Sequence, residues 1–264
     1  MRIIVLIKHV PDTWEERVLD PDTGRLDRSA SERVVDEITE RALEAALTLK
    51  DRDKSIEVVA LTMGPSESTG AIKKALSMGA DSGIHLVDDA LAGADAMTTA
   101  ATLAAALRDA GADLIIAGNE STDGRGGMIP AMIAEHLGLP ALTFVSELAI
   151  EGDRVRGERA TETATSVVSA PLPAIVSITE GMPEPRFPSF KGIMGAKKKP
   201  VASHSLADLE PALAGSRSSA SSVVLTCEQR PGRTGADPIV DEGDAGTQLA
   251  TFLIERRLAG QRLV

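Results

Sequence analysis

The first half of the chain alternates between two hydrophobic patterns, one typical of buried strands and one typical of helices. Continuous apolar runs rich in Val and Ile are typical of strands that are buried on both faces of a parallel sheet. They occupy residues 2–10, 55–62, 84–87 and 113–117. Apolar residues at helical spacing occupy residues 36–50, 67–78, 95–110 and 128–137. This alternation predicts a Rossmann-like α/β fold, whose doubly wound, mostly parallel sheet carries helices on both faces.

The alternation stops after about Ala141. Turn residues predict a hairpin over 149–156, and apolar runs predict strands that extend the sheet at 167–168 and 172–178. Residues 183–200 are expected to be an irregular basic segment, because Pro183, Pro185 and Pro188 disfavour a regular helix. The remaining predictions are a short helix within 206–214, a Ser- and Ala-rich linker over 215–222 and a terminal helix over 245–258.

Composition and charge exclude several classes of protein. With 28 basic and 39 acidic residues the net charge is −11, so we expect no binding to a nucleic-acid backbone. The single cysteine, Cys227, excludes a disulfide within the chain and a cysteine zinc cluster. We find no leader pattern and no apolar run near the ~20 residues of a membrane span. We therefore expect a soluble, cytoplasmic protein without a membrane span.

The best candidate for a small-molecule site is GNESTDGRGG at residues 118–127, between a predicted strand and a predicted helix. Such a loop can turn its backbone N–H groups inward, and the following helix N-terminus attracts phosphate. The segment matches neither the Walker A loop nor the GxGxxG fingerprint, and an ordinary solvated turn is the alternative interpretation. Gly64-Pro65-Ser66, after a neighbouring strand, is a candidate second wall.

No familiar catalytic arrangement is found. The histidines share no metal-ligand spacing, no serine lies in a GxSxG elbow, and Cys227 has no paired histidine in the sequence. Nothing in the sequence indicates a nucleophile or a general base. We therefore expect a binding or scaffold role and not an enzyme.

The second candidate is a Pro- and Lys-rich segment at residues 183–199. Aromatic residues make up only 2% of the chain, yet Phe187 and Phe190 both lie here, with Ile193, Met194 and several basic residues beside them. Exposed aromatic side chains surrounded by charge are typical of interface hot spots, and a basic island on an acidic chain would attract an acidic partner. The alternative is that the aromatic side chains are buried internally and the lysines are merely solvated.

Several segments together resemble the electron transfer flavoprotein β-subunit family. The resemblance covers essentially the whole chain and is most specific at EPRFPSFKGIMGAKKK, residues 184–199. The other matching segments are VLIKHVPD at 5–12, ALSMGAD at 75–81, AGNESTDGRGG at 117–127 and LPAIVSI at 172–178.

The resemblance implies an adenine nucleotide α-hydrolase-like fold and a non-catalytic subunit of a heterodimer. The α subunit would hold most of a redox-active FAD, and this subunit would hold a structural AMP. The heterodimer would carry electrons from acyl-CoA dehydrogenases of fatty acid oxidation and related flavoenzymes to a quinone-linked oxidoreductase. It also implies a nucleotide-binding domain over 1–200 and a C-terminal arm over 201–264 that contacts the α subunit.

The resemblance also assigns residues to two sites. AMP would contact Leu6, Asp36, Glu37, Ile38, Thr39, Met63, Gly118, Asn119, Glu120, Ser121, Thr122, Asp123, Gly124, Arg125, Gly126, Gly127, Met128 and Ile129. A recognition loop over 183–194 would dock on the dehydrogenase, with Phe190 as its anchor. Its docking residues would be Glu184, Pro185, Arg186, Phe187, Phe190, Ile193 and Met194.

The chain departs from the family pattern at two places. Ala160 stands where relatives often carry a carboxylate thought to pair with an α-subunit arginine, a role that Glu158 or Glu162 could take over. The nucleotide loop reads DGRGGMIP instead of a DGD-T-x-Q-x-G-P form, so Arg125 is itself a candidate phosphate ligand. Three alternatives remain. The first is a bifurcating relative with FAD in place of AMP, and the second is a free-standing adenine-nucleotide module of the universal-stress type. The third is an ATP-cleaving enzyme of related fold, for which the chain lacks the expected Ser-Gly-Gly phosphate loop.

Overall fold

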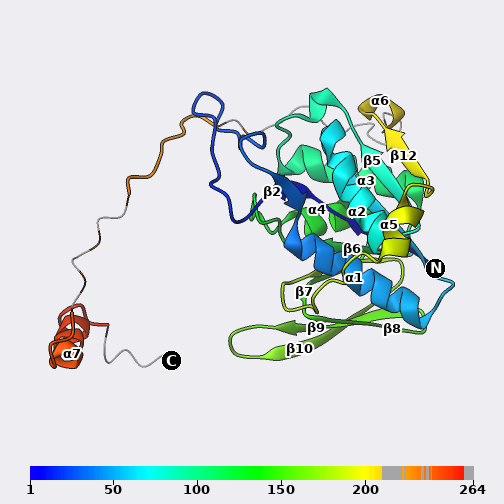
Figure 1. Ribbon diagram of the computed structural model, residues 1–264. Helices are drawn as coiled ribbons and strands as arrows, with labels where there is room; N and C mark the ends of the chain where they lie inside the picture. Colours follow the sequence, from blue (N-terminus) through cyan, green and yellow to red (C-terminus); the bar gives the residue numbers. More distant parts are fainter. Residues whose placement is uncertain (210–221, 223, 233–234, 236–237, 239, 259–264) are drawn as a thin grey trace. The chain divides into compact units, whose positions relative to one another are not determined.

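The computed structural model describes residues 1–209, 222, 224–232, 235, 238 and 240–258. Contacts divide the chain into one unit over 1–227 and another over 228–264 (Figure 1). The second unit contains the helix α7, Ala245–Glu255, within the predicted terminal helix. Nothing in the described part of the chain forms a helix that is long and apolar enough to cross a bilayer.

The first unit is built on a seven-stranded sheet with the order β12-β5-β4-β1-β6-β11-β7. All of its strand pairings are parallel, which confirms the predicted fold class. The strands are β1 Arg2–Leu6, β4 Glu57–Met63, β5 Ser82–Leu86, β6 Leu114–Gly118, β7 Ala141–Val145, β11 Ala174–Ile178 and β12 Val201–His204.

Helices cover both faces of this sheet, as predicted (Figure 1). The core on one face contains Ile3 and Val5 of β1 and the apolar faces of two helices, α1, Glu37–Arg52, and α2, Thr69–Met78. The helices α3, Ala96–Ala110, and α4, Ile129–Leu137, share the other core with the alternate residues of β1. The four predicted helices are thus confirmed to within two residues at each end, and a 3₁₀ turn over Ser66–Ser68 precedes α2.

Two predicted strand assignments were wrong. The apolar run at 2–10 is divided, because β2, His9–Pro11, leaves the central sheet and pairs with β3, Arg33–Val35. Residues 167–168 do not extend the central sheet. They lie in β10, Thr165–Pro171, the outer strand of a three-stranded antiparallel sheet with β9, Arg154–Ala160, and β8, Glu147–Glu151. The predicted hairpin over 149–156 is confirmed at the turn between β8 and β9.

The predicted irregular segment contains a short helix, α5, Phe190–Ala196. The prediction was wrong here because Pro183, Pro185 and Pro188 all precede the helix, and Ser189 caps it by accepting a hydrogen bond from the Gly192 N–H. The segment packs on α2 and then enters β12, which pairs with β5.

The residues assigned to the start of the arm belong to the first unit. Val201–His204 form the edge strand β12, and α6, Leu206–Leu209, buries Leu209 against the α3 face. Of the predicted helix within 206–214, residues 210–214 lie outside the described residues, as do residues 215–221 of the predicted linker.

Candidate nucleotide site and candidate docking surface

The order in which the chain adds strands to the central sheet reverses at β1. From β1 the chain builds β4 and β5 on one side and then returns to β6 on the other side. In open parallel sheets, ligands bind at the carboxyl ends of the strands where the order reverses in this way. Leu6 ends β1 and Gly118 ends β6, so both border that position.

A buried carboxylate joins two of the predicted nucleotide segments. One oxygen of Asp36 caps α1 by accepting hydrogen bonds from the backbone of Ile38, at 3.1 Å, and Thr39, at 3.2 Å. The other oxygen accepts from Thr122, at 2.6 Å from its backbone N–H and 2.7 Å from its hydroxyl. Gly118 allows this close approach, because an added Cβ would lie 3.0 Å from Ile38. The structure therefore brings residues 36–39 and the 118–129 loop together.

A second carboxylate fixes the same loop from its other side. The Asp123 side chain is 0% exposed and forms ion pairs with Lys8 at 2.7 Å and Arg28 at 2.8 Å. Burial raises the pKa of Asp123, but the Lys8 charge and hydrogen bonds from Lys8, Ser121 and Arg28 outweigh burial, so its pKa is about 2. The carboxylate is therefore ionised at neutral pH and its charge is compensated within the chain.

The loop has the backbone features expected of an anion site. Arg125, at φ +46°, and Gly127, at φ +63°, adopt left-handed conformations that curl the chain. The helix α4 begins at Ile129, and its N-cap residue Met128 supplies no side-chain cap, whereas Asp36 and Asp95 cap α1 and α3. No side-chain cap accepts from the N–H groups in the first turn of α4, where Pro130 itself has no N–H.

A buried polar atom in the loop lacks a partner. The side-chain oxygen of Asn119 is buried and accepts no hydrogen bond from any residue that the structure describes. Buried polar groups are rarely left unsatisfied, so this atom is available to a ligand. Met63, at the carboxyl end of β4, lies on the other side of β1 from this loop.

Three residues of this region carry no role in the sequence-based predictions. Lys8 follows β1, and a lysine within the apolar run predicted at 2–10 was a usable signal. Arg28 reaches Asp123 across 95 residues of sequence, and no local pattern indicated that contact. Phe144, at φ +58°, places its ring 3.9 Å from where a Gly127 Cβ would lie.

A hollow of about 290 Å³ adjoins the loop on the Phe144 side. Its lining residues are Phe144, Ser146, Arg159, Ala160, Thr161 and Thr179. Ala160, the position at which the resemblance implied a missing carboxylate, lines this hollow beside Arg159. Arg159 donates to the Thr143 carbonyl at 2.7 Å.

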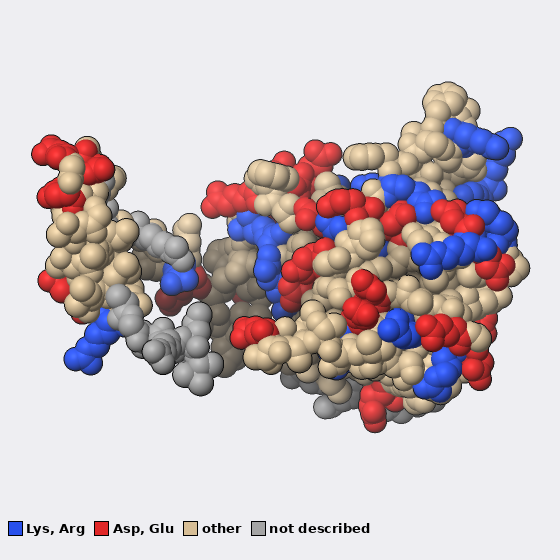
Figure 2. All heavy atoms as spheres, turned by 90° about the horizontal axis from the view of Figure 1, so that it is seen from below, with Lys and Arg blue, Asp and Glu red and all other residues tan. Residues whose placement is uncertain are grey.

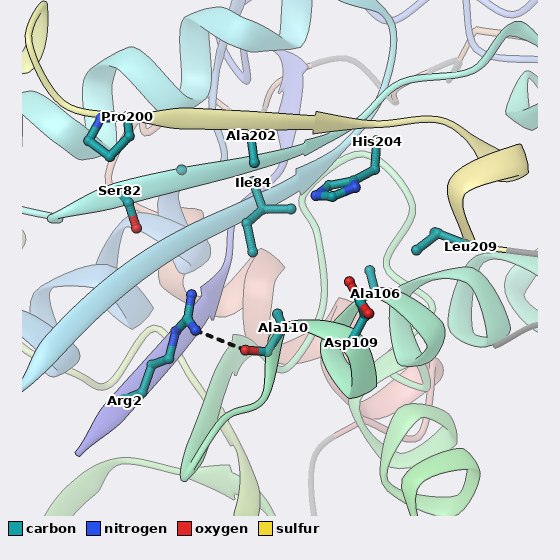
Figure 3. A pocket seen from close by; sticks show the side chains of 11 residues that line it. Arg2, Ser82, Ile84, Ala106, Asp109, Ala110, Pro200, Ala202, His204 and Leu209 are labelled. Atoms are coloured by element: carbon teal, nitrogen blue, oxygen red, sulfur yellow. Dashed lines mark hydrogen bonds between the residues drawn. The ribbon is translucent and has the colours of Figure 1, made fainter. Parts of the chain in front are cut away.

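Another cavity, of about 220 Å³, lies beside the first residues of β1 and β5 and along β12 (Figure 3). Arg2 and Asp109 line it together with His204, and Arg2 donates to the Ala110 carbonyl at 2.9 Å. It contains none of the residues predicted for nucleotide binding or docking. Among the described residues, no group of three or more His, Cys, Asp or Glu side chains could hold a metal ion.

The docking candidates separate into outward and inward side chains. Phe187 is 94% and Phe190 81% exposed, and Ile193 and Met194 are also exposed. Figure 2 shows this segment projecting at the upper right, where uncharged side chains are bordered by Lys and Arg. Internal burial of the two aromatic side chains is therefore not what the structure shows.

Glu184 and Arg186 contact other parts of the same chain instead. Glu184 forms an ion pair with Arg41, and Arg186 forms ion pairs with Glu44 and Asp51. These three partners lie on α1 or at its end.

Comparison with known proteins gives a consistent result. A family model described as the electron transfer flavoprotein domain matches residues 23–209. The electron transfer flavoprotein subunits beta of Mycobacterium leprae and Mycobacterium tuberculosis are each 47% identical over 266 residues, which cover 97% of this chain and 98% of the relative. Subunit CarD of the caffeyl-CoA reductase–Etf complex of Acetobacterium woodii is 33% identical over 97% of both chains.

Proposed function

This chain belongs to the electron transfer flavoprotein family as a β subunit, and from that membership we propose that it holds AMP in a cytoplasmic heterodimer with an FAD-carrying α subunit. Subunits of this kind are electron carriers and not enzymes. The heterodimer accepts electrons from acyl-CoA dehydrogenases of fatty acid oxidation and related flavoenzymes. It passes them to a quinone-linked oxidoreductase.

The observation that carries this proposal is the exposure of two of the four phenylalanines on one projecting segment. A chain with so few aromatic residues would lose apolar burial by leaving Phe187 and Phe190 in water. A partner that buries them recovers that free energy, and Lys191, Lys197 and Lys198 beside them favour an acidic rim. The partner surface is therefore an apolar pocket bordered by carboxylates.

The residues of the nucleotide loop fit AMP. The N–H groups of Ile129 and Ala131, on either side of Pro130 at the start of α4, are donors available to a phosphate, with Arg125 of the same loop as the cation. The unpartnered oxygen of Asn119 is available to a base amino group or a ribose hydroxyl. AMP supplies no redox chemistry, so its role in this site is structural. Asp36 and Asp123 orient the loop from both sides.

The experiment is electron uptake by the purified heterodimer from an acyl-CoA dehydrogenase. Phe190→Ala should slow the uptake at low dehydrogenase concentration, while FAD and AMP contents stay unchanged. Val167→Ala, which shortens an exposed apolar side chain on β10, is the matched control and should have no effect. Unchanged uptake by Phe190→Ala would contradict docking through this segment. A colourless homodimer that binds no α subunit would contradict the proposal as a whole and favour a universal-stress-type module.

The similarity to CarD gives a second candidate for the nucleotide site, which is FAD in place of AMP. Nucleotides released by denaturation distinguish the two. One FAD and one AMP per heterodimer support the proposal, whereas two FAD and no AMP support the second candidate.

A further inference from the structure

Arg186 is tied to α1 by a set of short hydrogen bonds. Its backbone N–H donates to Glu44 at 3.0 Å, and its Nε and Nη2 donate to the two Glu44 oxygens at 2.8 Å each. Nη2 also donates to Asp51 at 2.8 Å. Three of the five side-chain N–H donors of Arg186 therefore point to acceptors on α1.

Both members of the central pair are charged. Burial raises the pKa of Glu44, but the hydrogen bonds from Arg186 outweigh it, so its pKa lies below the ordinary value. The hydrogen bonds to Glu44 in turn raise the pKa of Arg186. A planar guanidinium held by both oxygens of one carboxylate has a fixed orientation, which a lysine cannot reproduce.

Other contacts fix the same segment on either side of Arg186. Arg41 donates to the Met182 carbonyl at 2.6 Å, just before the segment begins. In α5, Gly192 lies so close to α2 that an added Cβ would be 2.2 Å from the Ser77 carbonyl oxygen. After α5, Lys199 donates to the Leu76 carbonyl at 2.8 Å. The segment is therefore held against α1 and α2 before any partner arrives.

We infer that Arg186 is a positioning residue, which acts through Glu44 to hold residues 187–194 in the conformation that a partner binds, and does not itself contact the partner. This inference rests on the proposed function, because it concerns the same docking surface. Its physical basis is preorganisation: a loop that is ordered before binding loses less conformational entropy on binding. The outward side chains then bind as a preformed surface.

Charge steering and positioning predict opposite effects of one substitution. Glu44→Gln removes an acidic side chain next to a basic surface, so steering of an acidic partner would improve. The same substitution replaces one acceptor oxygen of the Arg186 pair by an amide donor, so the segment would lose its main attachment. Positioning therefore predicts weaker docking from a change that makes the surface more positive.

The test uses the heterodimer with its α subunit and an acyl-CoA dehydrogenase. For Glu44→Gln we expect the KM for the dehydrogenase to rise about tenfold with kcat within about twofold, because the surface is displaced and not removed. Arg186→Lys should behave like Arg186→Met, since charge alone does not restore the paired geometry. The double variant Glu44→Gln/Arg186→Met should be no worse than Arg186→Met alone, since Arg186→Met already removes the interaction that Glu44→Gln weakens.

Glu40→Gln is the matched control. Glu40 lies one turn before Glu44 on α1, and the side chains of Glu40 and Glu44 are both 13% exposed. Glu40 forms an ion pair with Lys74 of α2 and not with the docking segment. Its KM should stay at the wild-type value. Hydrogen exchange gives a readout apart from activity: the amides of Arg186, Gly192 and Ile193 should exchange faster in Glu44→Gln than in Glu40→Gln.

Three results would overturn the inference. They are an unchanged or lower KM for Glu44→Gln, additive losses in the double variant, and wild-type exchange of the segment amides in Glu44→Gln. If Phe190→Ala slows electron uptake while Glu44→Gln does not, only this inference fails. If Phe190→Ala has no effect on electron uptake, the proposed docking through this segment is itself contradicted, and this inference falls with it.

Discussion

Asp36 and Thr122 lie 86 residues apart in the sequence, yet the Asp36 carboxylate accepts hydrogen bonds from both the backbone N–H and the hydroxyl of Thr122. Because Asp36 also caps α1, the start of that helix and the nucleotide loop move as one unit. The loop conformation is thus set by buried hydrogen bonds, which makes it sensitive to single substitutions.

Thr122→Val should loosen the nucleotide loop. It removes one donor to a buried carboxylate, so the free energy of unfolding should fall by about 1–3 kcal/mol. The AMP content of the purified heterodimer should fall as well, as measured by nucleotide extraction. Thr102→Val is the control, because the buried Thr102 hydroxyl only donates to the Thr98 carbonyl within α3. A full AMP content in Thr122→Val would contradict a role for this contact.

Asp123 should make stability depend on acid pH. Its pKa is about 2 in the folded protein, below the ordinary value near 3.8, so the folded state favours the ionised form. The stabilisation is present above the ordinary pKa and is lost as pH falls towards 2. Asp123→Asn should lower the free energy of unfolding at pH 7 by about 2 kcal/mol.

The same variant should remove part of the acid dependence. Between pH 4 and pH 2 the difference between wild type and Asp123→Asn should shrink, as measured by urea unfolding at each pH. A constant difference across that range would show that the charge of Asp123 does not contribute.

Gly192→Ala should displace α5 and weaken docking. An added Cβ at Gly192 would lie 2.2 Å from the Ser77 carbonyl oxygen, so the helix must move away from α2. We expect a lower Tm and a higher KM for the dehydrogenase. Gly195→Ala in the same helix is the control: no atom lies within 4 Å of its added Cβ. Alanine there should be neutral or stabilise by up to about 1 kcal/mol. Equal effects of the two variants would contradict a packing role for Gly192.

The helix α7 should bind the α subunit through its apolar side chains. Leu249, Phe252 and Ile254 are all exposed within the second unit. Replacing all three by alanine should weaken the heterodimer at least about tenfold, since each buried apolar side chain contributes roughly 1.5–3 kcal/mol. Sedimentation of the two-subunit mixture measures this. The control Thr247→Ala/Thr251→Ala changes polar positions of the same helix and should leave association intact.

The apolar pattern predicted the buried strands of the central sheet and missed its two edges. Ile3 to Val5 of β1 and all of β11 are buried, so their sequences read as continuous apolar runs. At the edge, β12 has the sequence Val-Ala-Ser-His and three of its four residues are exposed, so no apolar run indicated it. The break between β1 and β2 was also missed, because hydrophobicity does not report where a strand leaves its sheet.

The candidate site was predictable where its signal was local. The Gly-rich loop at 118–127 follows a predicted strand, and both features are visible in the sequence. The ion pairs of Asp123 with Lys8 and Arg28 are long-range and depend on the folded chain. The ion pairs of Arg186 with α1 were not predictable either. An arginine between prolines and aromatic residues has the local sequence of an exposed surface.

The position of β11 between β6 and β7 constrains how the protein is made on the ribosome. Until Ala174–Ile178 have emerged, β6 is an open edge, and the Asn119 N–H lacks the Ile178 carbonyl to which it donates at 2.7 Å. At roughly 5–20 residues per second, translation from Gly118 to Ile178 takes about 3–12 s. During that interval the fold around the 118–129 loop is incomplete, and the exposed edge of β6 is a natural point for a chaperone to engage.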